Sequence, residues 1–592
     1  MSHQLAHPAD LSTVETQVAD AISTDEPWAL LEEFADLNRV SGTDDEVAAA
    51  EYITDRLDAF DVTYNRYDPE LYISQPHDAA IDVHDHEFSP DPVKTVSFAA
   101  STTVTGPVEY VGSPGESTLG AVEDRSVGHV PYEDIDDLSG TIALTAAGSL
   151  SIRATRLLED KGAIGVIAIH EHDEEPHNGI ATPVWGGAPP YEDRDRIPDI
   201  PIVNVTKPDG QTLRDLAETG LEVEVSTALT EGWFDCPLIE ARIDGGGDTD
   251  DFVLLHGHYD SWFVGITDNA TGDATLLELA RVFAAHAEEL DRDLRICWWP
   301  AHSTGRYAGS TWYADEFAHD LADHCVAHVN CDSPGAKDTT EYVDMSCWTP
   351  DTHGLVGDSI EAVADVPYEE HHPHRAGDYS FDNLGISGFF MLSSNIPVAV
   401  REARGYHQVG GCGGNSDAWH LSTDTLDKAG EDELHRDMIV YAVSVLRVLN
   451  ADVLPLDHRR TVAAIRDQVR TYDDIAGDDF DFAPTIDALD RLETRLQHFY
   501  DAAADGTITA ATANETIKAV GRTLTRLNLV ADGQFEQDPA LARDPVPRYA
   551  PVESFHRIED ADDRRFLALQ LQREQTAVTY DLEAAIDRVP TA

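Results

Sequence analysis

Two histidines and two aspartates follow predicted strands or precede a predicted helix in the central part of the chain. His258 ends the run DFVLLHGH, and Asp332 follows the run CVAHVNC. Asp268 lies in the loop GITDNATG before a long predicted helix, and His420 lies in DAWHLSTDT. In open parallel sheets, functional sites form beyond the carboxyl ends of the strands. Imidazoles and carboxylates from separate loops are the zinc ligands expected without thiolates, and a carboxylate can bridge two metals for hydrolysis.

Each of the two histidines has an acidic neighbour in the sequence. Asp260 lies two residues beyond His258, and Asp424 lies four residues beyond His420. A metal-bound imidazole usually donates its second N–H to a nearby acceptor such as a carboxylate, which fixes the ring. We therefore expect Asp260 and Asp424 to support the two imidazoles. The helix after Asp268 would direct its amide end into the same loop.

The segments around these residues alternate between strand and helix patterns over residues 236–450. Long amphipathic or buried helices are predicted for ATLLELARVFAAHAEEL and STWYADEFAHDLADH. Alternation of this kind predicts an α/β fold with a mostly parallel central sheet and helices on both faces. The predicted strands are LIEARI, DFVLLHGHYD, DLRICWWPA, CVAHVNCDS and ISGFFMLSS.

Three further regions flank or interrupt this α/β part. Residues 1–76 contain two amphipathic helices and one short strand, which we assign to the N-terminal part of the same domain. Residues 77–235 are rich in Gly, Pro and short β-prone runs around one clear helix, IRATRLLEDKG, and predict an inserted β-rich domain. Residues 451–592 carry only helical spacing and predict a C-terminal helical domain.

The composition limits the partners and the location of the protein. The 592 residues include 111 acidic and 40 basic side chains, a formal net charge of −71. Such a surface repels itself in dilute buffer, whereas in molar salt the Debye length falls to about 3 Å, so we expect adaptation to a salt-rich cytoplasm. Nucleic acid and anionic membranes are poor partners, because both need clustered cations. No apolar run is long enough to span a membrane, and we expect a cytoplasmic protein.

The cysteines do not form a metal or disulfide pattern. Six are scattered along the chain without a CxxC pair, so we interpret them mostly as buried thiols. Any metal would then be held by histidine and carboxylate side chains.

The run HGHYDSWFVGITDNATGDATLLELAR resembles the zinc aminopeptidase, glutamate carboxypeptidase and transferrin-receptor family of co-catalytic metallopeptidases (metallopeptidase family 28). The resemblance extends over nearly the whole chain. LSGTIALTAAGSLSIRATRLLEDKGAIGVIAIH is similar to the family's inserted protease-associated domain, and residues 451–592 are similar to a helical domain that often mediates dimerisation. The likeness implies one or two divalent ions, zinc with manganese or cobalt as alternatives, and a peptide or small aminoacyl substrate.

The resemblance also implies a role for each candidate residue. His258 and Asp332 would bind the first metal, His420 the second, and Asp268 would bridge the two. One part of the family pattern is absent. Where family members carry two adjacent glutamates, a general base and a ligand of the second metal, this chain has His302 and Ser303.

This replacement leaves three outcomes open for His302. The imidazole can act as a metal ligand and keep two metals, or as the general base of a one-metal hydrolase. The third outcome is a loss of catalysis, with the fold used for binding. The leading prediction is a metal-dependent exopeptidase-like hydrolase, an aminopeptidase, with His302 handling the proton. The alternatives are a non-catalytic transferrin-receptor-like scaffold and a metal-dependent acyl transferase of the glutaminyl-cyclase kind.

Overall fold

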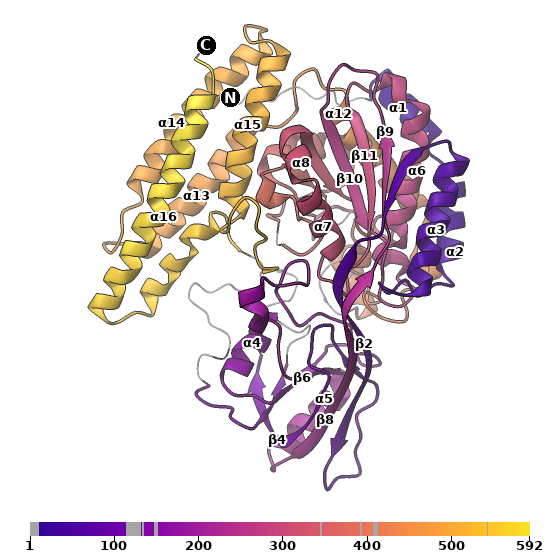
Figure 1. Cartoon of the computed structure of the whole chain (residues 1–592), viewed down its shortest axis with the longest axis vertical. Coiled ribbons are helices and arrows are strands. Elements are labelled where there is room, and N and C mark those ends of the chain that lie inside the picture. The colour runs from indigo at the N-terminus through magenta and orange to yellow at the C-terminus, as the bar shows by residue number, and fades with distance from the viewer. Residues whose placement is uncertain are drawn as a thin grey trace.

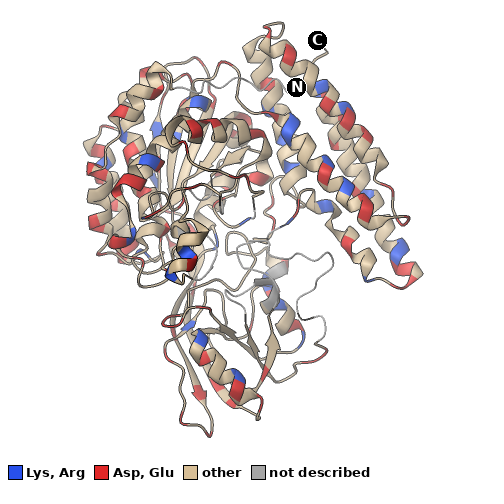
Figure 2. Ribbon diagram, turned by 180° about the vertical axis from the view of Figure 1, so that it is seen from behind, with Lys and Arg blue, Asp and Glu red and all other residues tan. Residues whose placement is uncertain are grey.

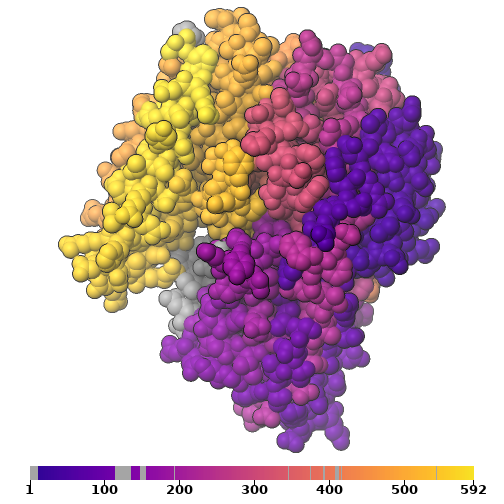
Figure 3. Space-filling model, viewed as in Figure 1, coloured from indigo at the N-terminus to yellow at the C-terminus, as the bar shows by residue number. Residues whose placement is uncertain are grey.

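The computed structural model describes residues 11–113, 132, 135–146, 152–343, 346–373, 375–390, 394–406, 412–541 and 543–591. The described chain forms three parts (Figure 1). An α/β part lies at the upper right, a group of long C-terminal helices at the upper left, and a β-rich part below them. Figure 3 shows a notch in the outline between the C-terminal helices and the β-rich part.

The central sheet of the α/β part has six strands in the order β1-β9-β11-β10-β12-β13. The four strands from β11 to β13 run parallel to one another, whereas β9 pairs antiparallel with β1 and β11. The fold is therefore α/β with a mixed sheet in which three of the five strand pairings are parallel. The strands are β1 (Thr63–Tyr67), β9 (Leu238–Ile243), β10 (Phe252–His258), β11 (Asp293–Trp299), β12 (Cys325–Asn330) and β13 (Gly388–Phe389).

The register of the parallel strands aligns their carboxyl ends. His258, the last residue of β10, pairs with Trp299, the last residue of β11. His256 pairs with Asn330, the last residue of β12. The chain segments that follow these three strands therefore leave the sheet at one edge, which is where a site is expected in such a sheet.

Alternate residues of the buried strands face two separate apolar cores. Val253, Leu255 and Ile296 belong to the core formed with α6 (Thr271–Ala285) and α12 (Glu431–Leu449). Phe252, Leu254 and Cys297 belong to the core formed with α7 (Ala308–Glu316) and α8 (Ala318–His324). Because both faces are covered, the strands contain near-continuous apolar runs. The remaining helices on the α6 side are α1 (Thr13–Ala21), α2 (Asp25–Phe34) and α3 (Asp44–Ala59).

The β-rich part is a second sheet of seven strands in the order β2-β8-β4-β5-β6-β7-β3. Its two longest strands, β2 and β8, pair antiparallel along their whole length. Two helices, α4 (Ile152–Asp160) and α5 (Lys207–Ala217), follow strands of the parallel portion. The strands are β2 (Glu70–Val83), β3 (Val93–Thr95), β4 (Thr103–Gly112), β5 (Ile142–Thr145), β6 (Gly165–Ile169), β7 (Ile202–Val205) and β8 (Glu222–Asp235).

The C-terminal part is helical, and its helices pack through regularly spaced apolar residues. α14 and α15 both contact α13 and α16. Leu492 and Leu496 on α14 and Leu571 and Val578 on α16 are buried in this core. The elements are α13 (His458–Ala476), α14 (Ala483–Ala504), α15 (Ala510–Leu529), η7 (Pro547–His556) and α16 (Ala561–Arg588).

Shorter elements connect these parts. They are η1 (Tyr191–Arg196), η2 (Ile266–Ala270), η3 (Ala287–Glu289), η4 (Pro350–Thr352), α9 (His353–Val363), η5 (Asp382–Leu384), α10 (Val398–Arg404), α11 (Cys412–Asn415) and η6 (Leu426–Lys428).

The sequence pattern misses several local details. The predicted strand ISGFFMLSS forms only the two-residue β13, and residues 391–393 lie outside the described chain. The single helix predicted from Ser310 is divided at Phe317 into α7 and α8. The five cysteines whose side chains are described are buried, as expected.

Charged residues occur in every part of the described chain. Figure 2 shows acidic residues on all three parts, with basic residues scattered among them. In the described chain, every helix is too short or too polar to cross a bilayer.

Candidate metal centre

All four predicted ligand side chains lie at the edge of the sheet where the parallel strands end. β10 supplies His258, and Asp332 lies two residues beyond the end of β12. Asp268 lies in the turn η2 that leads into α6. His420 is in the loop before η6, with a left-handed backbone conformation at φ 56°. Strand ends and a helix start thus position three of the four groups, and a loop positions the fourth.

Asp268 lies between the two imidazoles. Its Oδ1 is 3.3 Å from Nε2 of His258, and its Oδ2 is 3.2 Å from Nε2 of His420. One carboxylate therefore presents a separate oxygen to each histidine. This is the arrangement that a carboxylate bridging two cations requires.

His258 also faces Asp332 and His302. Nε2 of His258 is 3.7 Å from Oδ2 of Asp332. His258, His302 and Asp332 each offer one ligand atom, and these atoms lie within 4.8 Å of one another. The rings of His258 and His302 are stacked, with centroids 3.7 Å apart. Three donors this close together can share a single cation.

Three of the candidate ligand atoms are buried and have no hydrogen-bond partner within the described chain. They are Nε2 of His258, Oδ1 of Asp268 and Oδ2 of Asp332. A buried polar atom normally has a partner, because leaving it unpaired costs about 1–3 kcal/mol. A divalent cation satisfies oxygen and nitrogen donors together, so these residues fit a metal.

The charges in the cluster are strongly coupled. Burial opposes protonation of His258, but Asp268 and Asp332 outweigh it and raise the pKa of His258 well above its usual range. Burial raises the pKa of Asp332 to about 6, against the opposing effect of His258. Two carboxylates held together away from water thus favour a positive charge between them.

His302 is held by a buried carboxylate. Its Nδ1 is 2.9 Å from Oδ2 of Asp378. Asp378 also accepts a hydrogen bond of 2.7 Å from the hydroxyl of Ser310, which lies 2.9 Å from Ser380. The indole N–H of Trp185 donates to Ser380. Because Nδ1 faces Asp378, Nε2 is the nitrogen of His302 that is free to act in the site.

Asp260 supports the segment that carries His302 and Ser303. Its two carboxylate oxygens accept the backbone N–H groups of His302 and Ser303, each at 2.9 Å. The Asp260 carboxylate also pairs with His258, as predicted, with its Oδ1 3.8 Å from Nδ1 of the ring. The shorter contact of Nδ1, at 2.9 Å, is with the backbone carbonyl of Asp260.

Asp424 supports the Asp268 turn and does not hold His420, which corrects the second predicted pairing. It accepts the backbone N–H groups of Thr267 and Asp268 and the hydroxyl of Thr267. Burial raises the pKa of Asp424 to about 7. Nδ1 of His420 lies 3.1 Å from the backbone carbonyl of Asn178, in the β-rich part.

The β-rich part therefore takes part in building the site. Glu175 accepts hydrogen bonds from the backbone N–H and hydroxyl of Ser422, two residues from His420, and pairs with Lys94 at 2.7 Å. Sequence reasoning misses the contact of His420 because a backbone carbonyl leaves no signal in residue type.

A buried arginine fixes the loop between His258 and Asp268. The guanidinium of Arg39 donates to the backbone carbonyls of Tyr259, Val264 and Gly265. Arg39 lies outside every motif considered above, so the sequence alone gives no sign of this role.

The central part of the chain is similar to known peptidases. Residues 239–443 match Peptidase family M28. A stretch of 239 residues is 24% identical to the probable glutamate carboxypeptidase VP8 of Zea mays, covering 39% of this chain and 33% of that protein. A stretch of 94 residues is 33% identical to the aminopeptidase NAALADL1 of Mus musculus, covering 15% of this chain and 12% of that protein. These matches span a third or less of each relative's length.

Solved structures share the fold. The aminopeptidase from Aneurinibacillus sp. strain AM-1 superposes with a TM-score of 0.54 at 21% identity, over 73% of this chain and 95% of that one. BSAP, a zinc aminopeptidase from Bacillus subtilis, superposes with a TM-score of 0.51 at 17% identity, over 72% of this chain and 94% of that one. The matched segment contains His258, Asp268, Asp332 and His420. Residues 239–443 of this chain are therefore similar to peptidase family M28.

Proposed function

We propose that the protein is a metal-dependent exopeptidase that removes residues from the amino terminus of peptides. One observation carries the proposal: Asp268 presents one oxygen to His258 and the other to His420, at 3.3 Å and 3.2 Å. The M28 match and the zinc aminopeptidase fold support it.

His258, Asp268 and Asp332 would hold one divalent cation, and Asp268 and His420 would contribute to a second. Imidazole and carboxylate donors without thiolate suit zinc, with manganese or cobalt as alternatives. A cation bound there supplies Lewis-acid polarisation of the scissile carbonyl and an acidified water.

His302 would handle the proton in the place where related enzymes carry a glutamate. Asp378 accepts from Nδ1 of His302 and stabilises the protonated ring, so Nε2 is free to take up a proton and return it. Metal content separates the two roles left for His302. If His302 is a general base, the His302→Ala variant keeps its metal content and loses turnover. If His302 is a metal ligand, the variant loses metal as well as turnover.

The test of the function is turnover of aminoacyl and dipeptide substrates. The assay uses about 2–3 M KCl, where surface charges are strongly screened, with added zinc, manganese or cobalt. We expect release of the amino-terminal residue by the native chain and none by His258→Ala. Native chain that holds metal and turns over no substrate would contradict the proposal.

The serine at position 303, where the family resemblance implies a glutamate ligand, supports a second candidate function, a binding scaffold without catalysis. A neutral hydroxyl is a poor zinc ligand compared with a carboxylate, and the backbone of Ser303 is held by Asp260. Metal-dependent acyl transfer is a third candidate. Turnover that is lost in His258→Ala excludes the scaffold, and product analysis separates cyclisation from hydrolysis.

We also propose that the C-terminal helices form a homodimer. α16 exposes Phe566 and Leu569, which are 70% and 50% exposed and lie three residues apart on one face. Light scattering would show a dimer for the native chain and a monomer for the double variant Phe566→Ser, Leu569→Ser. A native monomer would overturn the proposal.

A further inference from the structure

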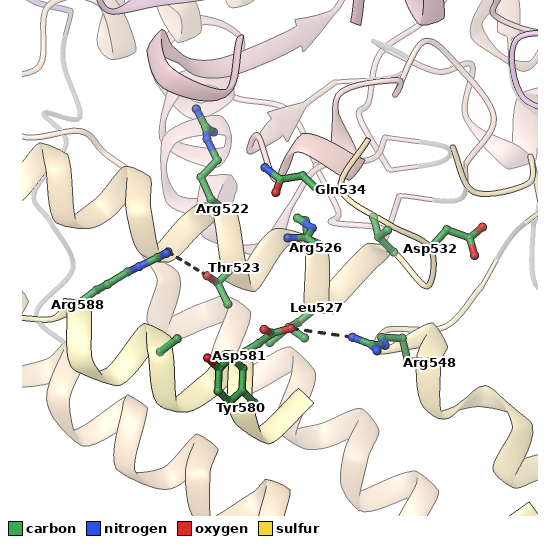
Figure 4. Close-up of a pocket in the computed structure, with 12 residues that line it drawn as sticks. Arg522, Thr523, Arg526, Leu527, Asp532, Gln534, Arg548, Tyr580, Asp581 and Arg588 are labelled. Carbon is green, nitrogen blue, oxygen red and sulfur yellow. Dashed lines mark hydrogen bonds and ion pairs between the residues drawn. The ribbon is translucent and has the colours of Figure 1, made fainter. Parts of the chain in front are cut away.

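The C-terminal helices enclose a cavity of about 360 Å³ that is separate from the metal centre. It lies between α15, α16, the start of η7 and the segment that follows α15 (Figure 4). Its charged lining consists of Arg522, Arg526, Arg548, Arg588, Asp532 and Asp581.

The charge of this cavity is opposite to that of the chain. The protein has 111 acidic and only 40 basic residues. The cavity wall contains four arginines and two aspartates and is therefore net positive. A high acidic content alone gives no reason for several of the few basic residues to line one cavity, so this cluster of arginines requires a separate explanation.

Three of the four arginines already have partners. Arg522 donates to the backbone carbonyl of Ala322 at 3.0 Å and to that of Cys325, and so attaches α15 to the α/β part. Arg548 pairs with Glu574 at 2.8 Å and with Asp581 at 3.9 Å. Arg588 donates to the carbonyl of Ala519 at 2.9 Å. Figure 4 shows Arg522 directed toward the neighbouring part, Arg588 beside Thr523 at one end of the cavity, Arg548 beside Asp581 at the other end, and Arg526 between them.

Arg526 is different. It is half-buried, and within the described chain its guanidinium donates no hydrogen bond and pairs with no carboxylate; its Nε is among the buried atoms without a partner. Burial lowers the pKa of Arg526; the charge of Asp581 opposes this, and Arg548 has a smaller effect in the same direction as burial. Holding a partly desolvated guanidinium near a second cation costs free energy unless an anion compensates for it.

We propose that this cavity binds a small oxyanion, a carboxylate or phosphate group, through Arg526, with Arg548 and Arg588 elsewhere in the lining. The planar guanidinium of Arg526 presents paired N–H donors to an oxyanion, which a lysine could not do. The cavity volume lies near the lower end of the range for small-molecule sites, about 300–1,000 Å³. The ligand class is therefore a small organic or inorganic anion. The proposal does not depend on peptidase activity.

The test is a calorimetric titration of the full chain at a fixed KCl concentration. Inorganic phosphate and succinate are the two probes, because they separate the two sources of oxyanion. We expect one saturable site per chain for at least one probe, and an affinity at least about tenfold weaker in Arg526→Gln, since a hydrogen bond to a charged group contributes about 1.5–3 kcal/mol. Arg565→Gln is the matched control, because Arg565 lies on α16 and is 82% exposed.

Thermal melts complete the test. Because Arg526 has no partner in the described chain, Arg526→Gln should not lower the melting temperature without ligand, whereas the binding probe should raise it only when Arg526 is present. Arg526→Met repeats the test with the aliphatic stem retained. Three results would overturn the proposal: no saturable binding of either probe, equal affinity in Arg526→Gln, or a lower melting temperature in both variants without ligand.

Discussion

His302 and the buried Asp378 form a hydrogen-bonded pair, with Nδ1 of the imidazole 2.9 Å from Oδ2 of the carboxylate. His302 outweighs the effect of burial and lowers the pKa of Asp378. An ionised aspartate behind an imidazole both orients the ring and stabilises its protonated form. Our proposal assigns the proton transfer of the reaction to this pair.

Asp378→Asn tests the pair. Asparagine keeps the shape but loses the charge, so we expect kcat to fall by about 100-fold or more while KM changes little. Ser310→Ala is the comparison, because it removes one hydrogen bond from Asp378 and leaves the charge. It should reduce kcat less than Asp378→Asn. A native kcat in Asp378→Asn, with metal still bound, would show that Asp378 has no part in the reaction.

The second prediction concerns the backbone beneath His302. Asp260→Ala leaves the amides of His302 and Ser303 without acceptors, at a cost of at least about 2 kcal/mol. Hydrogen exchange of a peptide spanning residues 298–306 should become at least about 30-fold faster. Asp260→Asn keeps one acceptor oxygen and should show a smaller increase. Equal exchange in Asp260→Ala and native protein would contradict this account of the loop.

The third prediction concerns the contact between the β-rich part and His420. Glu175→Gln weakens the charge-assisted hydrogen bonds to Ser422 and Lys94. We expect kcat/KM to fall by about tenfold, because the carbonyl of Asn178 would then hold His420 less firmly. Glu171→Gln breaks a comparable pair with Lys207 on the surface of the same part and should leave kcat/KM unchanged. Identical effects of the two substitutions would count against a positioning role.

The fourth prediction follows from the charge. With a net charge of −71, repulsion across the surface destabilises the fold unless salt screens it. Circular dichroism melts should give a clearly higher melting temperature in about 3 M KCl than in about 0.1 M KCl. Equal melting temperatures would remove the argument for adaptation to salt.

The sequence predicts the sheet and the four candidate ligands better than their supporting contacts. Strands with apolar residues on both faces are recognisable, and polar residues at their carboxyl ends, such as His258, mark the edge where sites form. Supporting contacts depend on which chain segments meet in space. His420 faces a backbone carbonyl at Asn178, and Asp260 turns toward the amides of His302 and Ser303. These contacts could not be predicted from the sequence, because closeness along the chain does not determine which atoms meet in the folded structure.

Metal content tests the central claim most directly. The native chain, reconstituted with zinc and passed through a desalting column in about 3 M KCl, should retain at least about one zinc per chain by elemental analysis. His258→Ala should retain almost none, while His420→Ala should keep the ion held by His258, Asp268 and Asp332. A native chain that folds by circular dichroism and yet retains less than a tenth of an equivalent of zinc, manganese or cobalt would contradict the account.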